Sequence, residues 1–388
     1  MYRELNPFHK GSRIIDNNTH SFSSLFQKSE GKSNPIHMPV IKRGKGPYLY
    51  DYDENRYIDF ELSGGSLLLG HAPPGITAVM KNWLSRGYAA GYPVVAHQML
   101  SSKISALVLG DEPVEGAWLF YNSSIEASTA VLTILNLFRE NPRGLYISPH
   151  EDKKSFAPFQ YTCIKDIDMK KLKNSIVSDI DFAVVKPGRG YEGSVEDVLH
   201  KFKKSEVLLI SDETDFASHV HFRQYQSLLD DVDMRVFGSY LSSGISFGSV
   251  FVKKKLFFNE AKTMDYSQFK NISTFSYGLP LYIMKAIIKY FGLLQKQGGI
   301  SGLLDKSRRF YTMLDDKYFD LLDGIVYFKT SKQQRKAYAR LRLELLKNCL
   351  YFPVFFGDSI NISHAHSDAV LKKSAERINI LLSDFYRK

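Results

Sequence analysis

Cysteine and tryptophan are scarce in this chain of 388 residues, which has two of each. Cys163 and Cys349 do not form a CxxC pair, so neither a disulfide framework nor a thiolate metal site is expected. Long apolar runs are missing as well, since stretches such as 66–70 are far shorter than the roughly 20 residues of a membrane-spanning helix. Residues 1–28 are polar and contain no apolar segment of the signal-peptide kind. These absences predict a soluble, cytoplasmic protein with no membrane among its partners.

The sequence is basic, but it contains no familiar nucleic-acid-binding motif. Lysine and arginine number 51 against 41 acidic residues, which gives a formal charge of +10. Such a surface attracts nucleic acid, anionic lipid or phosphorylated ligands. The basic clusters, of which 253–255 is one, are short and scattered, with no arginine-rich arm and no zinc-finger spacing. We therefore favour a lysine-rich surface of a globular protein, with binding to nucleic acid or membrane as an alternative.

Short apolar strands alternate with helical segments through the middle of the chain. With 44% hydrophobic and 24% charged residues, the composition is that of a globular protein that is long enough to bury a large core. Strands spaced by helices predict a mostly parallel α/β sheet, and two alternating runs around 53–55 predict a β-hairpin before it. The strands are expected at 118–121, 144–147, 182–185, 207–210 and 235–237, and the main helices at 76–86, 97–109, 126–138 and 281–297.

Three of these strand ends carry residues suited to a ligand, because ligands of open α/β sheets collect at the carboxyl ends of the strands. Residues 122–127 (Asn-Ser-Ser-Ile-Glu-Ala) join a strand to a helix and fit either a phosphate cradle or a simple helix cap. The acids Asp212 and Glu213 follow a buried strand, where they fit a cationic ring nitrogen, a sugar hydroxyl, a metal or a capping pair. Residues 237–248 are rich in glycine and serine, which permits either a close ligand or a tight turn.

Taken together and in this order, the three stretches resemble the class III pyridoxal-phosphate (PLP) aminotransferases, most closely the glutamate-1-semialdehyde 2,1-aminomutases. The strongest likeness is the run 43–59, continued by 69–72, and a further likeness is 362–368 near the end of the chain. The resemblance covers about residues 35–385, with the stretch 140–205 shortened.

The resemblance implies a fold type I architecture, in which a large α/β domain with a seven-stranded, mostly parallel sheet accompanies a small α+β domain. It also implies PLP as the cofactor and a homodimer as the assembly. On this basis four segments are expected: an N-terminal segment at 1–38, small-domain residues at 39–74, the large domain at 75–280 and the C-terminal small domain at 281–388.

The resemblance carries a set of cofactor contacts onto this chain. Asp212 matches the carboxylate that contacts the pyridine nitrogen and keeps the ring an electron sink, and Glu213 matches the acid beside it. The family's phosphate-binding Ser-Gly-Thr matches Ser123, Ser124 and Ile125. One hydroxyl ligand is therefore missing, and the turn is more crowded.

The largest departure from the family lies at its Schiff-base lysine. The ungapped match puts Ser239 at that position, and a serine hydroxyl neither forms an imine nor readily accepts a proton near neutral pH. A family acid has become Lys186, and the ring-stacking aromatic has become a proline before His150. Thr274 matches the threonine that reaches the phosphate of the neighbouring subunit.

Two hypotheses follow from these departures. In the first, the chain has lost ordinary transamination and serves as a ligand-binding protein or as a subunit, in a homodimer or a heterodimer with an aminotransferase-like partner whose site Thr274 completes. In the second, it is a PLP enzyme of altered chemistry that acts on a small amino compound and holds PLP non-covalently or through another lysine. Lys186 or His150 is then the base, or Lys186 and Arg189 hold an anionic substrate.

Several other polar residues are interpreted as structural. His71 is expected to support a turn, and His364 and His366 to lie in a turn before the last helix. His219 and His221 alternate as on a strand, with a spacing that suits a metal but with no third ligand in sight. Three basic residues of a helix at 339–348 are assigned to its solvated face: Arg340, Arg342 and Lys347.

Overall fold

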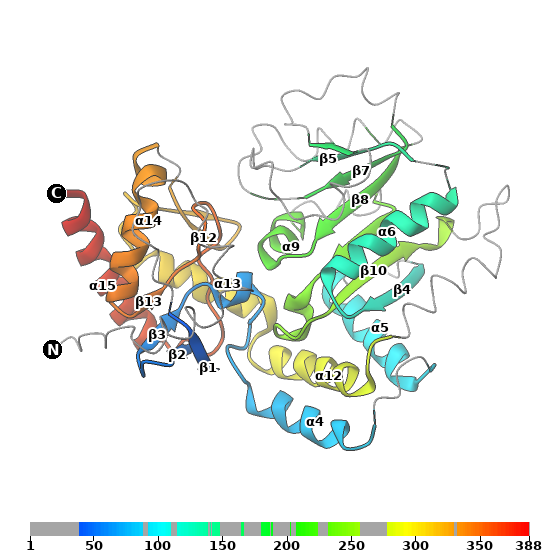
Figure 1. Ribbon diagram of the computed structural model, residues 1–388, viewed down its shortest axis with the longest axis horizontal. Coiled ribbons are helices and arrows are strands. Elements are labelled where there is room, and N and C mark those ends of the chain that lie inside the picture. The colour runs from blue at the N-terminus through cyan, green and yellow to red at the C-terminus, as the bar shows by residue number, and fades with distance from the viewer. Residues whose placement is uncertain are drawn as a thin grey trace, which may run out of the picture. The chain divides into compact units, whose positions relative to one another are not determined.

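The computed structural model describes most of the chain as two compact units (Figure 1). One unit contains the described residues up to Pro73 and those from Gln297 onwards, and the other is Pro74–Lys296. The described residues are 39–87, 92–109, 115–138, 140, 142–147, 164–166, 180–186, 188, 202, 207–223, 232–256, 278–329 and 332–387.

The unit of Pro74–Lys296 is built on a seven-stranded sheet. Five neighbouring strands pair in parallel, and β10 runs antiparallel to both of its neighbours. The expected mostly parallel α/β sheet is therefore confirmed. In spatial order the strands are β4 (Gly116–Tyr121), β10 (Gly248–Lys253), β9 (Met234–Phe237), β8 (Leu208–Glu213), β7 (Phe182–Val185), β5 (Gly144–Ile147) and β6 (Ile164–Asp166).

Apolar strands and amphipathic helices form the core of this unit. β7 reads Phe-Ala-Val-Val and all four residues are buried, as expected for a central strand of a sheet covered by helices. The helix α6 packs against β4, β9 and β10, while α12 packs against α4 and α5. The described helices are α4 (Pro74–Leu84), α5 (Val95–Val108), α6 (Ser124–Phe138), α9 (Phe216–Arg223), α12 (Leu281–Lys296) and the short 3-10 helices η3 (Ser239–Ser242) and η4 (Lys254–Leu256).

The other unit combines a small sheet with three longer helices. Its four strands follow the order β1–β2–β3–β13, of which the last pair is parallel, and β11 and β12 form a separate hairpin. The strands are β1 (Ile41–Lys45), β2 (Tyr48–Asp51), β3 (Arg56–Asp59), β11 (Phe319–Leu322), β12 (Ile325–Phe328) and β13 (Leu350–Tyr351). The helices are α3 (Leu62–Gly65), α13 (Gly299–Tyr311), α14 (Lys332–Lys347) and α15 (Asp368–Arg387).

The predicted hairpin is confirmed as β2 and β3, and a buried acid organises its turn. Asp51 accepts hydrogen bonds from the backbone N–H of Asn55 (2.7 Å), the Asn55 side-chain amide (2.9 Å) and the Tyr57 hydroxyl (2.8 Å). His71 pairs with Asp59 at 2.7 Å between Nε2 and Oδ2. Short-range polar contacts of this kind fix the conformation of the turn.

Two expectations about polar residues are wrong. Arg342 lies on α14 but is only 5% exposed, and its Nε donates to the carbonyl of Phe352 at 3.1 Å, because this face of α14 packs on the strand that follows it. Arg340 and Lys347 are exposed, as predicted. His219 and His221 lie on the helix α9 and not on a strand, since Asp215 caps that helix by accepting from the N–H of Ser218 at 2.7 Å.

Neither unit offers, within its described residues, a helix with the length and apolar character needed to cross a membrane.

Candidate functional site

The two acids predicted at the end of a strand lie inside it, because β8 extends to Glu213 and does not end at 210. Asp212 and Glu213 are 4% and 0% exposed. Neighbouring residues of a strand point to opposite faces of the sheet, so the two carboxylates face different surroundings. Each is satisfied by its own set of donors.

The Asp212 carboxylate accepts three hydrogen bonds. The Tyr146 hydroxyl donates to Oδ2 at 2.8 Å, and Thr214 donates to Oδ1 through its N–H (3.1 Å) and its hydroxyl (2.6 Å). Tyr146 comes from β5, which is separated from β8 by β7. The contact therefore joins β5 to β8 across β7.

The Glu213 carboxylate belongs to a buried ionic cluster. Arg235 donates to both carboxylate oxygens, at 2.7 Å from Nε and 2.8 Å from Nη2, and Ser211 donates to Oε1 at 2.7 Å. The Nδ1 of His219 lies 2.8 Å from Oε2. Burial raises the pKa of Glu213, but Arg235 and His219 outweigh burial and lower the pKa to about 2. Glu213 is thus an anion whose charge Arg235 neutralises.

His219 is a neutral member of this cluster. Burial lowers its pKa, and this effect exceeds the opposing influence of Glu213, so the ring stays uncharged near neutral pH. Its Nδ1 faces a carboxylate, which assigns the proton to Nδ1. The ring stacks on Tyr240 with centroids 5.2 Å apart. Within the described part of the chain, no three His, Cys, Asp or Glu side chains gather as a metal site would require.

Ser239 begins a tight 3-10 turn, η3 (Ser239–Ser242), directly after β9. Gly238 before it is required by space, because a Cβ atom there would lie 2.0 Å from the carbonyl oxygen of Thr214. The turn ends with Ser243 and Gly244 at φ of 58° and 77°, in the left-handed region. Since β9 pairs in parallel with β8, Ser239 lies at the same sheet edge as Asp212.

The start of α6 is capped by the chain itself. The Ser123 hydroxyl accepts from the N–H of Glu126 at 3.1 Å, and the Glu126 carboxylate accepts from the N–H of Asn122 at 3.0 Å. Ser124 is the first residue of the helix, and Ile125 is 59% exposed. This end of α6 therefore shows the geometry of a helix cap, with an apolar side chain beside it.

Lys186, which follows β7, forms an ion pair at this edge of the sheet. Its Nζ lies 2.8 Å from Oδ2 of Asp215, the residue that caps α9. Burial raises the pKa of Asp215, but Lys186 and the donors of Ser218 outweigh burial and hold the pKa below its ordinary value.

Three residues that donate hydrogen bonds to the two acids were not identified from the sequence: Tyr146, Thr214 and Arg235. Tyr146 and Arg235 lie in apolar strands, so the pattern assigned them to the core without a polar role. The predicted site residues His150, Arg189 and Thr274 lie outside the described residues.

Comparison with known proteins gives partial sequence matches. No protein-family model matches the chain. A glutamate-1-semialdehyde 2,1-aminomutase of Legionella pneumophila is 33% identical over 138 residues, which is 36% of this chain and 30% of the relative. A protein of that name from Thermodesulfovibrio yellowstonii is 26% identical over 260 residues, or 58% of this chain and 59% of the relative. The chain thus matches less than two thirds of the length of these curated relatives.

Solved structures match over almost the whole chain. A structure described as a transaminase with PLP bound superposes with a TM-score of 0.75 and 17% identity, covering 98% of this chain and 99% of that one. An omega-transaminase from Sphaerobacter thermophilus gives a TM-score of 0.72 and 13% identity, covering 96% and 99%. The chain has the fold type I architecture of the PLP-dependent aminotransferases. In this aminotransferase fold, the unit of Pro74–Lys296 contains the large mostly parallel sheet.

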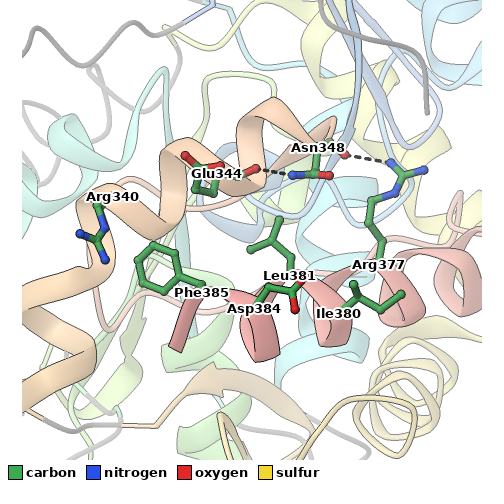
Figure 2. A pocket seen from close by; sticks show the side chains of 8 residues that line it. All are labelled: Arg340, Glu344, Asn348, Arg377, Ile380, Leu381, Asp384 and Phe385. Atoms are coloured by element: carbon green, nitrogen blue, oxygen red, sulfur yellow. Dashed lines mark hydrogen bonds between the residues drawn. The ribbon is translucent and has the colours of Figure 1, made fainter. Parts of the chain in front are cut away.

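A cavity of about 510 Å³ opens between α14 and α15, in the other unit of this aminotransferase fold (Figure 2). None of the site residues predicted from the sequence lines it. Arg340 stacks over the ring of Phe385 at 4.8 Å, and Arg377 donates to the carbonyl of Asn348 at 2.8 Å. Its lining mixes both charges with apolar groups: Arg340, Glu344, Asn348, Arg377, Ile380, Leu381, Asp384 and Phe385.

Proposed function

We propose that this aminotransferase-like chain does not carry out ordinary transamination and acts as a ligand-binding or partner subunit. The observation that carries the proposal is Ser239, the residue matched to the Schiff-base lysine. It follows β9 at the carboxyl edge of the sheet, where ligands of such folds bind. A hydroxyl cannot form an imine, so this position lacks the amine that would hold the cofactor aldehyde and move a proton.

The described residues at the carboxyl ends of the parallel strands are not suited to hold PLP through an imine. Among them, Lys186 supplies an amine, and its Nζ is held in an ion pair with Asp215 at 2.8 Å. Ile125 offers no hydroxyl to a phosphate. Asp212, the acid matched to the ring-nitrogen contact, already accepts three hydrogen bonds from Tyr146 and Thr214. These contacts support a protein that does not use the cofactor in the ordinary way.

An exposed apolar surface supports the role of a partner subunit. Val95 and Met99 lie one turn apart on α5 and are 74% and 41% exposed, and Tyr92 just before the helix is 68% exposed. Large apolar side chains grouped in the open are typical of protein–protein contacts. We propose a second chain of the same fold as the partner, in a homodimer or a heterodimer.

The test is to incubate the full chain with PLP, record the absorbance, reduce with borohydride and map adducts by mass spectrometry. We expect no adduct concentrated on one lysine, because Ser239 has no amine and the Nζ of Lys186 is paired with Asp215. We also expect no conversion of PLP to pyridoxamine phosphate when amino donors are added.

A stoichiometric adduct at Lys186, together with turnover of an amino donor, contradicts the proposal. That outcome favours the second function, a PLP enzyme of altered chemistry with Lys186 as its substitute lysine. The Lys186→Arg variant is the matched control, since adducts that persist in it belong to surface lysines. Analytical ultracentrifugation of Val95→Asp beside the natural chain tests the partner surface, and we expect the substitution to weaken self-association or partner binding.

A further inference from the structure

The Asp212 carboxylate is occupied by donors of this chain on both of its oxygens. Oδ2 accepts from the Tyr146 hydroxyl at 2.8 Å, and Oδ1 accepts from the N–H and the hydroxyl of Thr214 at 3.1 and 2.6 Å. Both Asp212 and Tyr146 are buried, at 4% and 2% exposure. A buried carboxylate with three short hydrogen bonds is satisfied as an anion without any ligand.

Strand order explains how Tyr146 reaches this acid. Tyr146 on β5 lies opposite Val184 of β7, and Val184 lies opposite Ile210 of β8. Asp212 is two residues further along β8 and therefore points to the same face as Ile210. The long side chain of Tyr146 crosses over β7, so that its hydroxyl lies within hydrogen-bond distance of Asp212.

The neighbouring acid cannot take over the role of Asp212. Glu213 points to the opposite face and is held by Arg235, His219 and Ser211 at 2.7–2.8 Å. The end of β8 thus presents no carboxylate oxygen that lacks a donor from the chain. A protonated ring nitrogen therefore competes for the lone pairs of either acid with donors that are already in place.

We propose that Tyr146 is a specificity-determining residue that disfavours the binding of ligands with a protonated ring nitrogen at Asp212. Its neutral hydroxyl uses a lone pair of Oδ2 and reduces the attraction of the carboxylate for a pyridinium N–H. This inference rests on the proposed function, in which the chain does not use PLP for transamination. It names the residue that weakens binding of the cofactor ring.

The experiment compares the full natural chain with Tyr146→Phe. The probe is pyridoxine 5′-phosphate, which has the ring nitrogen and the phosphate but no aldehyde, so it cannot form imines with lysines. Calorimetric titration is expected to give weak binding to the natural chain and roughly tenfold tighter binding to the variant, because a hydrogen bond to a charged group is regained. Benzyl phosphate, which lacks the ring nitrogen, is expected to bind both proteins equally.

Three further variants make the result specific. Tyr338→Phe removes another buried hydroxyl, which donates to the carbonyl of Pro353 at 2.7 Å in the other unit, and is expected to change nothing. Thr214→Val removes the hydroxyl donor to Oδ1 of Asp212 and keeps the backbone N–H donor. It keeps the proposal testable where Tyr146→Phe fails to fold, and a smaller gain is expected. Adding Asp212→Asn to Tyr146→Phe is expected to abolish the gain.

Equal affinity for pyridoxine 5′-phosphate in the natural chain, Tyr146→Phe and Thr214→Val overturns the inference. A gain that survives Asp212→Asn, or that benzyl phosphate shares, also overturns it, because the ring nitrogen is then not the group recognised. If the proposed function fails, the natural chain forms a reducible PLP adduct and turns over an amino donor. The titration with pyridoxine 5′-phosphate does not detect either result, so the two failures can be told apart.

Discussion

Both units contain buried carboxylates, and two of those in the large sheet accept from distant strands as well as from nearby residues. In the hairpin, Asp51 accepts from Asn55 and Tyr57, which are four and six residues away. In the large sheet, Asp212 accepts from Tyr146, 66 residues away, and Glu213 accepts from Arg235, 22 residues away. The hairpin acid organises its own turn, whereas the sheet acids cross-link separate strands.

This difference shows that acids at a ligand-binding edge can serve the scaffold itself. A buried ion pair that spans two strands is strongly destabilising to break, because one charge is left without its partner. The hairpin acid loses less, because Asn55 and Tyr57 donate to it as neutral groups and its replacement leaves no buried cation behind. We therefore expect the sheet acids to matter more for the stability of the chain alone than the hairpin acid does.

The largest effect is expected when Arg235 is replaced by Met. Glu213 is then a buried charge without its cation, and the free energy of unfolding should fall by about 3–5 kcal/mol. Urea denaturation followed by circular dichroism measures the change. Arg308→Ala removes an exposed ion pair with Asp305 and serves as the control, with an expected change of less than about 1 kcal/mol. A similar small loss for Arg235→Met means that the cluster does not stabilise the sheet.

The pH dependence of stability should separate the two units. Glu213 has a pKa of about 2 when folded and 4.5 ordinarily, so its contribution is complete above pH 4.5 and is lost as the pH falls toward 2. The shift corresponds to about 3 kcal/mol. Urea unfolding between pH 2 and pH 4.5 measures the effect. We expect the Glu213→Gln variant to lose the pH dependence of stability in this interval. An unchanged pH profile contradicts the assignment.

His366 should act at higher pH, in the other unit. Burial is the main reason that its pKa is lowered from 6.5 to about 4. Between pH 6.5 and pH 4, His366 therefore binds a proton in the unfolded chain but not in the folded chain. The free energy of unfolding should fall as the pH drops through this interval. The slope of unfolding free energy against pH in that interval should flatten in His366→Gln. A slope that persists assigns the effect to other groups.

The Asp212→Asn variant tests whether this carboxylate stabilises the folded chain or serves only to bind a ligand. The amide cannot accept from Tyr146 and Thr214 as the carboxylate does, so we expect the chain without ligand to lose about 1–3 kcal/mol of unfolding free energy. A residue kept only for a ligand would leave the stability unchanged or raise it. Urea unfolding of the natural chain and the variant in the absence of PLP settles this point.

The smallest effect is expected at the hairpin. Asp51→Asn weakens contacts with Asn55 and Tyr57 but leaves no charge without a partner, and we expect a loss of about 1 kcal/mol. Denaturation of this variant beside Arg235→Met completes the comparison between local and long-range acids. A loss at Asp51 as large as the loss at Arg235 breaks the comparison.

Much of the fold could be predicted from the sequence because it depends on local patterns. The strands at 144–147 and 182–185 are continuous apolar runs, and the expected helices carry their apolar residues at helical spacing. His219 and His221 were misassigned because two residues with one between them fit a strand as well as a helix. Arg342 was misassigned because a long basic side chain on a helix is usually solvated, and only the packing of α14 buries it.

The alternating strands and helices and the hairpin around 53–55 could be predicted because each depends on residues close together in the chain. For residues 122–127 the sequence left a phosphate cradle and a helix cap open, and for Asp212 and Glu213 it placed the end of the strand too early. Which groups meet the two acids depends on the tertiary structure. Tyr146 reaches Asp212 because β7 lies between β5 and β8 in this register, and neither strand order nor register is written in a local pattern.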